Sequence, residues 1–182
     1  TQNIYTPREI EASSLVENDR PFASYLLVTR GKSFTDDQPG FGLRGEFSGG
    51  ILGRYSGGGR MQSALHDVLS FADPLPGWAN EVKPDILLNY ELQVSQWFSV
   101  SSRFRFTTTL TGQLGTLYTN LAPELKISWL AIRMNGNRTL RFDLFSNAKL
   151  VAYDATLTGG LLNRDERYRG EIRPKRLVSL FG

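Results

Sequence analysis

The sequence predicts an all-β protein with one short helix, and two patterns carry this prediction. Several segments alternate apolar and polar residues one by one, which is the period of a half-buried β-strand. Residues 60–72 instead place their apolar side chains three and four positions apart, which is the helical spacing. Eighteen glycines in 182 residues supply turn positions between strands. This length predicts a single domain over residues 1–182.

Three strand segments are clear and five are weaker. Strict alternation runs through residues 88–95, 103–110 and 139–145, and residues 124–132 begin in the same way. Further strand candidates are residues 22–30, 40–52, 149–158 and 176–181. Residues typical of turns separate them, at 31–40, 121–124, 134–138 and 158–166. The chain therefore predicts roughly eight strands of about ten residues each.

Two architectures fit such strands. In a soluble sandwich or barrel, the apolar face points inward and the charged face meets water. In a transmembrane β-barrel, the apolar face meets lipid and the polar face lines the interior, and about 9–11 tilted residues span the bilayer. Aromatic residues near the strand ends would suit interfacial girdles; they are Tyr90, Trp97, Phe98, Trp129 and Tyr153. The alternation by itself leaves both architectures open.

The one helical segment also carries the only histidine. Its apolar positions are Met61, Ala64, Leu65, Val68, Leu69 and Ala72. Three glycines precede the helix, and Asp73 with Pro74 should end it. Gln62 lies one turn before His66, and Asp73 lies two turns after it, so all three can share one side of the helix.

A lone histidine is usually structural or exposed, but the surroundings of His66 favour a function. Its helix interrupts a strand-rich chain, between a glycine loop and a polar turn. A carboxylate at helical spacing can fix the tautomer of the imidazole and stabilise the imidazolium. We therefore predict His66 as a general base that activates water or a hydroxyl, with Asp73 orienting its ring.

Composition excludes several other functions. Without cysteine, the chain has no disulfide, thiolate zinc site or cysteine nucleophile. A single histidine excludes a metal site built from several histidines. The net charge of +3 comes from scattered Arg and Lys, so no nucleic-acid partner is expected. No apolar run approaches the ~20 residues of a membrane-spanning helix.

Four segments, read in order, resemble the outer-membrane lipid A 3'-O-deacylase family. They are "QNIYTP" at residues 2–7, "DRPFAS" at 19–24, "QSALH" at 62–66 and "GWANEVKPD" at 77–85. The corresponding family motifs read approximately Q-x-x-Y-T-P, D-R-P-Y-A-G, Q-x-x-x-H and G-W-x-N-Q. The motifs cover about the first half of the chain, and the second half matches only as generic barrel strands.

The resemblance implies a fold and a chemistry. It implies a bacterial outer-membrane β-barrel of about a dozen strands, of which roughly eight are present here. It implies a calcium-dependent ester hydrolase that removes the 3'-linked acyloxyacyl group of lipid A, close to the outer-leaflet surface. The family's general base falls on His66. Arg20 is our candidate for binding a lipid A phosphate or carbonyl, with a structural arginine tied to Asp19 as its alternative, and Gln62 is a second candidate for substrate binding.

The chain also departs from the family. Phe22 and Ser24 stand where tyrosine and glycine are usual, and Glu81 occupies a glutamine position. An Asn-Asp pair and a Y-T-x-G motif, which help to build the family's calcium and substrate site, are not found, so calcium ligands cannot be assigned. We therefore expect the domain to be incomplete at its N-terminus. Two alternatives stay open: a non-catalytic outer-membrane barrel, inactive or part of a complex, and a soluble barrel that binds an apolar ligand.

Overall fold

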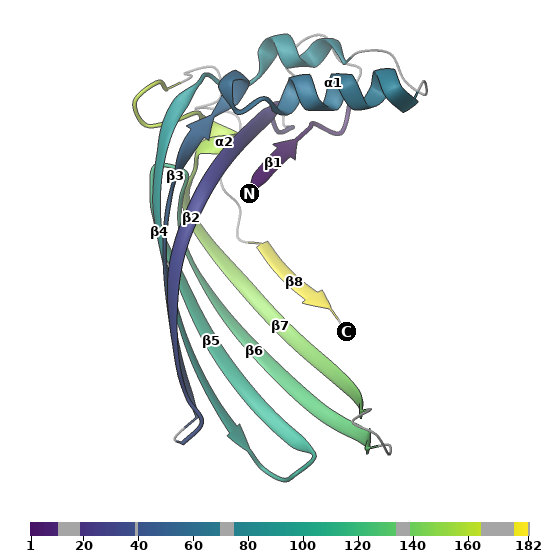
Figure 1. The fold of residues 1–182 in the computed structure, drawn as a ribbon, viewed down its shortest axis with the longest axis vertical. Helices are drawn as coiled ribbons and strands as arrows, with labels where there is room; N and C mark the ends of the chain where they lie inside the picture. Colours follow the sequence, from purple (N-terminus) through teal and green to yellow (C-terminus); the bar gives the residue numbers. More distant parts are fainter. Residues whose placement is uncertain (11–18, 39, 70–74, 134–138, 165–176, 182) are drawn as a thin grey trace.

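The protein forms one curved, open antiparallel sheet with a helix across one end (Figure 1). The computed structural model describes residues 1–10, 19–38, 40–69, 75–133, 139–164 and 177–181. Its eight strands pair strictly in chain order, from β1 to β8. Sequential antiparallel pairing with marked curvature is the topology of an up-and-down β-barrel.

Six strands are long enough to cross a bilayer. They are β2 (Ala23–Asp36), β3 (Phe41–Leu52), β4 (Asp85–Ser99), β5 (Phe104–Gly115), β6 (Tyr118–Arg133) and β7 (Thr139–Asp154). Each has at least 12 residues, more than the ~9–11 that a tilted spanning strand needs. Two short strands, β1 (Gln2–Tyr5) and β8 (Leu177–Phe181), flank them.

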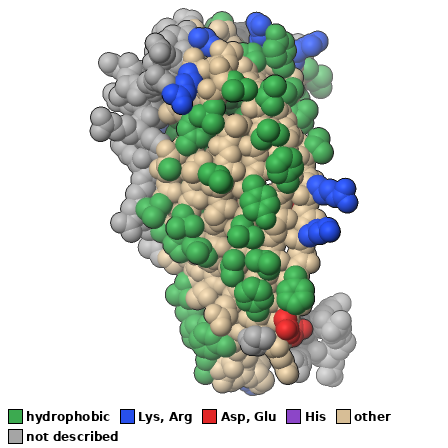
Figure 2. All heavy atoms as spheres, turned by 90° about the vertical axis from the view of Figure 1, so that its left-hand side faces the viewer, with side chains coloured by type: hydrophobic (Ala, Val, Ile, Leu, Met, Phe, Trp, Pro, Cys, Tyr) green, Lys and Arg blue, Asp and Glu red, His purple; other side chains and the backbone are tan. Residues whose placement is uncertain are grey.

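The convex face of the sheet is apolar and exposed. Val28 on β2 is 78% exposed, Leu88 on β4 is 50% exposed and Leu114 on β5 is 71% exposed. Figure 2 shows hydrophobic side chains spread over this whole face. A soluble barrel would turn this apolar set inward, so the structure selects the transmembrane alternative. Among the described residues, no helix is long and apolar enough to span a membrane.

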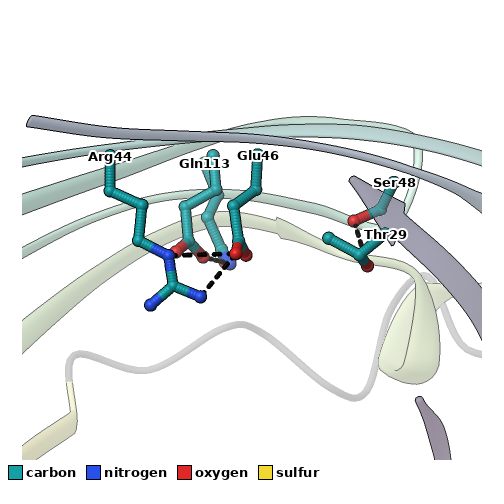
Figure 3. Close-up of polar contacts among 6 residues, drawn as sticks. Thr29, Arg44, Glu46, Ser48 and Gln113 are labelled. Atoms are coloured by element: carbon teal, nitrogen blue, oxygen red, sulfur yellow. Dashed lines mark hydrogen bonds and ion pairs between the residues drawn. The ribbon is translucent and has the colours of Figure 1, made fainter. Parts of the chain in front are cut away.

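The concave face carries polar side chains that bind one another (Figure 3). Arg44 Nε donates to Glu46 Oε1 at 2.9 Å on β3. The hydroxyls of Thr29 and Ser48 share a hydrogen bond of 2.8 Å between β2 and β3. Gln113 of β5 donates to a Glu91 carboxylate oxygen on β4 at 2.5 Å. Such contacts are typical of the interior of a membrane barrel.

The small buried core gathers at the end of the sheet where the helix lies. Its members are Ala23, Tyr25, Leu52, Val82, Leu87, Leu117 and Ala155. Two 3-10 turns, η1 (Gly53–Ser56) and η2 (Pro76–Asn80), lie on either side of helix α1 (Gly58–Leu69) in the chain. The helix predicted for residues 60–72 is therefore confirmed as far as Leu69, and it begins two residues earlier, inside the glycine run. Residues 70–72 lie outside the described residues.

Three strand boundaries predicted from the sequence are wrong. The two strands predicted at 139–145 and 149–158 are one strand, β7, followed by a short helix, α2 (Ala155–Thr158), which Asp154 caps through the Thr156 amide. The turn predicted at 121–124 lies inside β6, where Pro123 pairs with Leu110. The turn predicted at 31–40 is mostly strand, because β2 continues to Asp36. Strand β1 was not predicted, since four residues are too few to show a period.

Candidate active site at helix α1

Helix α1 packs against β2 and η2 through glycines. A Cβ on Gly58 would lie 2.3 Å from the Ser24 Cβ of β2. A Cβ on Gly59 would lie 2.9 Å from the Trp78 ring of η2. Gly57 has a φ of +78°, in the left-handed region that favours glycine. Because these glycines have no side chains, the first turn of α1 packs directly against Ser24 of β2 and Trp78 of η2.

A buried polar cluster lies beneath this turn, and we call it the serine–glutamate cluster: Ser24, Ser56 and Glu81. The Ser24 hydroxyl donates to Glu81 Oε1 at 2.5 Å and lies 2.6 Å from the Ser56 hydroxyl. Both serines are buried. The Gln2 side chain donates to the Ser56 carbonyl at 2.8 Å, which ties β1 to the cluster. Hydrogen bonds of this kind fix the relative positions of β1, β2 and η1.

Burial raises the pKa of Glu81 from its ordinary 4.5 to about 7, against the opposing effect of the Ser24 hydrogen bond. Glu81 lies in the loop between η2 and β4, outside the spanning strands. The charged and neutral forms of this carboxyl are therefore both populated near neutral pH.

The four motif segments meet at this end of the molecule. The rings of Phe22 and Trp78 lie 5.0 Å apart, and the Val82 amide donates to the Phe22 carbonyl at 3.0 Å. Segment 19–24 thus packs against segment 77–85, and both contact the start of α1 through Ser24 and Trp78. Segments separated by up to about eighty positions in the chain therefore build one site.

Arg20 contacts the first motif segment and the β7–α2 corner. Its guanidinium stacks on the Tyr5 ring at 3.9 Å and donates to the Thr156 hydroxyl at 3.2 Å. Asp19 accepts the backbone amides of Arg8 and Arg20 at 2.5 and 2.7 Å. The buried Arg20 Nε has no hydrogen-bond partner among the described residues. These contacts hold Arg20 in place through Tyr5 and Thr156, and its role towards a substrate stays a prediction.

The other predicted site residues lie on or after α1. Gln62 is on the second turn, and its Oε1 is buried without a partner in the described part of the chain. His66 lies on the third turn, but its side chain falls outside what the structure describes. Asp73 lies outside the described residues, so its pairing with His66 stays a prediction.

The exposed side of α1 is apolar. Met61, Leu65 and Val68 are 52%, 55% and 80% exposed, and they follow one another by four and three residues along the helix. These are half of the apolar positions that the periodicity predicted. An apolar stripe that faces outward on a membrane protein suits contact with acyl chains.

Sequence reasoning missed the serine–glutamate cluster as a unit. A signal was present, because Ser24 and Glu81 are two of the departures from the family motifs, and they contact each other. In place of a glycine and a glutamine, the chain has a hydroxyl that donates to a carboxyl group.

The described residues do not form a metal site. Within them, no three His, Cys, Asp or Glu side chains lie close enough together to hold a metal ion. A calcium ion takes six to eight oxygen ligands, whereas the serine–glutamate cluster offers one carboxyl and two hydroxyls that already bind one another. The described residues therefore do not assign a set of calcium ligands.

Comparisons with known proteins give a family and a fold. The model of the family described as outer membrane protein LpxR matches residues 1–181. No curated protein matches the chain. Among solved structures, the chain is similar to LpxR from Salmonella typhimurium, with a TM-score of 0.73 and 18% identity. The match covers 91% of this chain and 64% of that one, so the chain spans less than two thirds of the matched protein. At this identity, the likeness shows the fold.

Proposed function

This chain belongs to the family of outer membrane protein LpxR, and we propose that it is a lipid A deacylase, a carboxylic ester hydrolase that acts on the 3'-linked acyloxyacyl chain. It is an outer-membrane protein with a β-barrel fold. The family match and the exposed apolar wall together exclude the soluble barrel that the sequence pattern had left open.

The observation that carries the proposal is the convergence of the four motif segments at helix α1. Ser24 and Trp78 join two of these segments to the glycines of α1, the helix that carries the third, and Arg20 stacks on Tyr5 of the fourth. His66 lies on this helix, and an apolar stripe lies on the same helix. A histidine on a helix that also exposes apolar side chains, at the end of a membrane barrel, would suit ester hydrolysis of a lipid.

The proposed chemistry is general-base hydrolysis. The imidazole of His66 takes a proton from water, and the water oxygen forms a bond to the acyl carbon of the ester. The C–O bond to the sugar then breaks, and the sugar oxygen takes the proton back from the imidazolium. The products are a fatty acid and the 3'-alcohol. Asp73 would orient the imidazole.

Binding of the substrate would use groups that hold phosphate, carbonyl or acyl chains. Arg20 would bind a phosphate or carbonyl oxygen through its guanidinium. The buried Gln62 amide would bind a polar group of the sugar. The serine–glutamate cluster lies under α1, where its hydrogen bonds would keep β2 and η1 in position.

Calcium dependence is also proposed, from the family resemblance. When bound, the cation would polarise the ester carbonyl as a Lewis acid. No step above depends on it, because the described residues contain no set of ligands that fits it.

Mass spectrometry of lipid A from cells that express the full-length parent protein tests the proposal. Wild-type protein should remove one acyloxyacyl mass, and His66→Ala should abolish the loss, an effect of at least 10²-fold on the rate. Thr29→Ala in the barrel wall is the matched control and should behave as wild type. Chelation of calcium should abolish the activity if the metal proposal holds.

Unchanged lipid A beside folded wild-type barrel would refute the deacylase proposal. It would favour the alternative of a non-catalytic barrel, inactive or part of an outer-membrane complex. The non-catalytic alternative is retained because the described residues contain no assigned set of calcium ligands.

A further inference from the structure

The second half of the chain reaches the candidate active site at one corner. Strand β7 ends at Asp154, and the short helix α2 follows it at the end of the sheet where α1 lies (Figure 1). None of the four motif segments includes this corner. Thr156 of α2 is only 1% exposed, and it binds the guanidinium of Arg20, 136 positions earlier in the chain. The corner is therefore a part of the site that the motifs do not report.

The hydroxyl of Thr156 can bind Arg20 in one direction only. A guanidinium donates and cannot accept, so the Thr156 oxygen accepts the hydrogen bond from Arg20 Nη2 at 3.2 Å. The hydroxyl has a single proton, and it donates this proton to Asp154 Oδ1 at 2.6 Å. The same carboxylate oxygen accepts the Thr156 amide at 2.9 Å. Asp154 therefore fixes the orientation of the hydroxyl that holds Arg20.

Tyr5 holds the guanidinium from a second side. The guanidinium carbon of Arg20 lies 3.9 Å from the centre of the Tyr5 ring. The Tyr5 ring is held in turn, because its hydroxyl lies 3.0 Å from the hydroxyl of Tyr118 on β6. A planar guanidinium that stacks on a ring and bonds along one edge keeps little freedom to rotate. Arg20 therefore has a defined orientation before any ligand binds.

These contacts orient Arg20 without neutralising it. Neither ion pair found among the described residues includes Arg20. The adjacent Asp19 accepts the backbone amide of Arg20, whereas the guanidinium bonds to the neutral hydroxyl of Thr156. Nη1 has no hydrogen bond within the described ranges, and it is not one of the buried unpaired atoms there. A full positive charge with an open donor suits a phosphate oxygen better than a neutral carbonyl.

We propose that Thr156 and Asp154 are positioning residues for Arg20. Asp154 orients the Thr156 hydroxyl, and this hydroxyl holds the guanidinium in the orientation that binds a phosphate of lipid A. The inference rests on the proposed function, in which Arg20 binds the substrate. Neither positioning residue touches the substrate itself, and the second half of the chain contributes to phosphate recognition through them.

Native mass spectrometry of the full-length protein in detergent, titrated with lipid A or with dephosphorylated lipid A, tests the proposal. All proteins carry His66→Ala, so that the ligand is not hydrolysed. The parent should bind the phosphorylated form more tightly. Thr156→Val keeps the size of the side chain and removes the hydroxyl. It should weaken binding of phosphorylated lipid A about tenfold, because a hydrogen bond to a charged group is lost, and leave binding of the dephosphorylated form unchanged.

Variants that keep an oxygen at the right place should restore binding. Thr156→Ser retains the hydroxyl and should bind phosphorylated lipid A as the parent does. Asp154→Ala should weaken binding in the same way as Thr156→Val. Asp154→Asn should weaken it less, because the amide oxygen can still accept the Thr156 hydroxyl.

Arg20→Gln completes a double-mutant cycle. In this background, Thr156→Val should have no further effect on binding, since the guanidinium that it positions is gone. Thr158→Val is the matched control on the same helix, because the Thr158 hydroxyl donates to the Asp154 backbone carbonyl instead. This control should bind both forms of lipid A as the parent does.

Two results would overturn the proposal. One is an equal loss from Thr156→Val with and without Arg20, and the other is an equal loss for both forms of lipid A, since either would show a general effect on folding. Deacylation is measured separately in proteins that retain His66. Active wild type, with normal lipid A binding by Thr156→Val, would overturn the positioning role alone. Inactive wild type that binds lipid A through Arg20 and Thr156 would refute the deacylase function alone.

Discussion

Strand β2 belongs to two regions that are built in different ways. At its start, Ser24 lies beneath α1 and contacts Gly58, Ser56 and Glu81 at close range. From Val28 onward, its side chains simply alternate between lipid and the concave face. In the first region, close packing and hydrogen bonds between particular residues set the structure. In the second region, the side chains only alternate between the two faces of the sheet.

The difference decides what each region tolerates. In the wall, most side chains need only the right polarity for their face, because lipid or water fills the remaining space. The close approaches at Gly31 and Gly45 are to side chains, Glu46 and Tyr90, which can shift. At the α1 end, backbone and side chains meet with no space for a methyl group. The proposed chemistry depends on the region that has little tolerance.

The largest effect is expected for Gly58→Ala. Its Cβ would lie 2.3 Å from the Ser24 Cβ, so α1 or β2 must move. Overpacking of this kind typically costs 1–3 kcal/mol. We expect urea unfolding in detergent to show a loss in this range. We also expect lipid A deacylation to fall at least tenfold, because α1 carries His66.

Two further variants sharpen this comparison. Gly49→Ala in the wall should be neutral within about 0.5 kcal/mol, since its Cβ would find its nearest neighbour, in Leu88, at 3.8 Å. Ser24→Gly removes the colliding atom but also the hydroxyl that binds Ser56 and Glu81, so the loss in the double variant should be smaller than the sum of the two single losses. Additive losses in the double variant would show that Gly58 and Ser24 do not interact as described.

The second effect concerns the pH dependence of stability. Burial raises the pKa of Glu81 from 4.5 to about 7 in the folded protein. The folded state therefore holds this proton more tightly than the unfolded state, and its stabilising contribution is complete below pH 4.5. That contribution is lost as the pH rises through about 7. Unfolding free energies measured at pH 5 and pH 8 should differ by about 1 kcal/mol through this group, because partial exposure screens the effect.

Glu81→Gln provides the control for this prediction. The amide is similar in size and does not titrate, so the difference between pH 5 and pH 8 should shrink by the contribution of Glu81. Ser24 can still donate to the amide oxygen, which keeps the cluster together. An unchanged pH dependence in this variant would show that other groups cause it.

The strands of the wall could be predicted from the sequence, whereas the contacts at the α1 end could not. Alternation identified the long strands, since each wall residue needs only its own polarity to be placed. The same rule failed at residues 121–124, because Pro123 suggested a turn. Pro123 instead lies inside β6 and pairs with Leu110 of β5.

At the α1 end, the motifs identified segments that contact one another in the structure, but they did not predict which residues make the contacts. The helix and its histidine followed from spacing within a dozen residues. The contact between Ser24 and Glu81 joins residues 57 positions apart, and no local pattern reports it. The periodicity of apolar and polar residues could not predict the packing of Gly58 on Ser24 either, because glycine has no side chain that could enter such a pattern.

The smallest effect is expected for Thr29→Val in the wall. The Thr29 hydroxyl binds Ser48 at 2.8 Å, but both groups are on the open concave face, where water can replace the bond (Figure 3). Replacing an exposed hydrogen bond should cost no more than about 0.5 kcal/mol, measured by urea unfolding in detergent beside Ser48→Ala. Deacylation should stay at the wild-type rate, because α1 keeps all its contacts. A loss above about 1 kcal/mol would mean that the polar contacts of the wall are as specific as those beneath α1, and the contrast between the two regions of β2 would then fail.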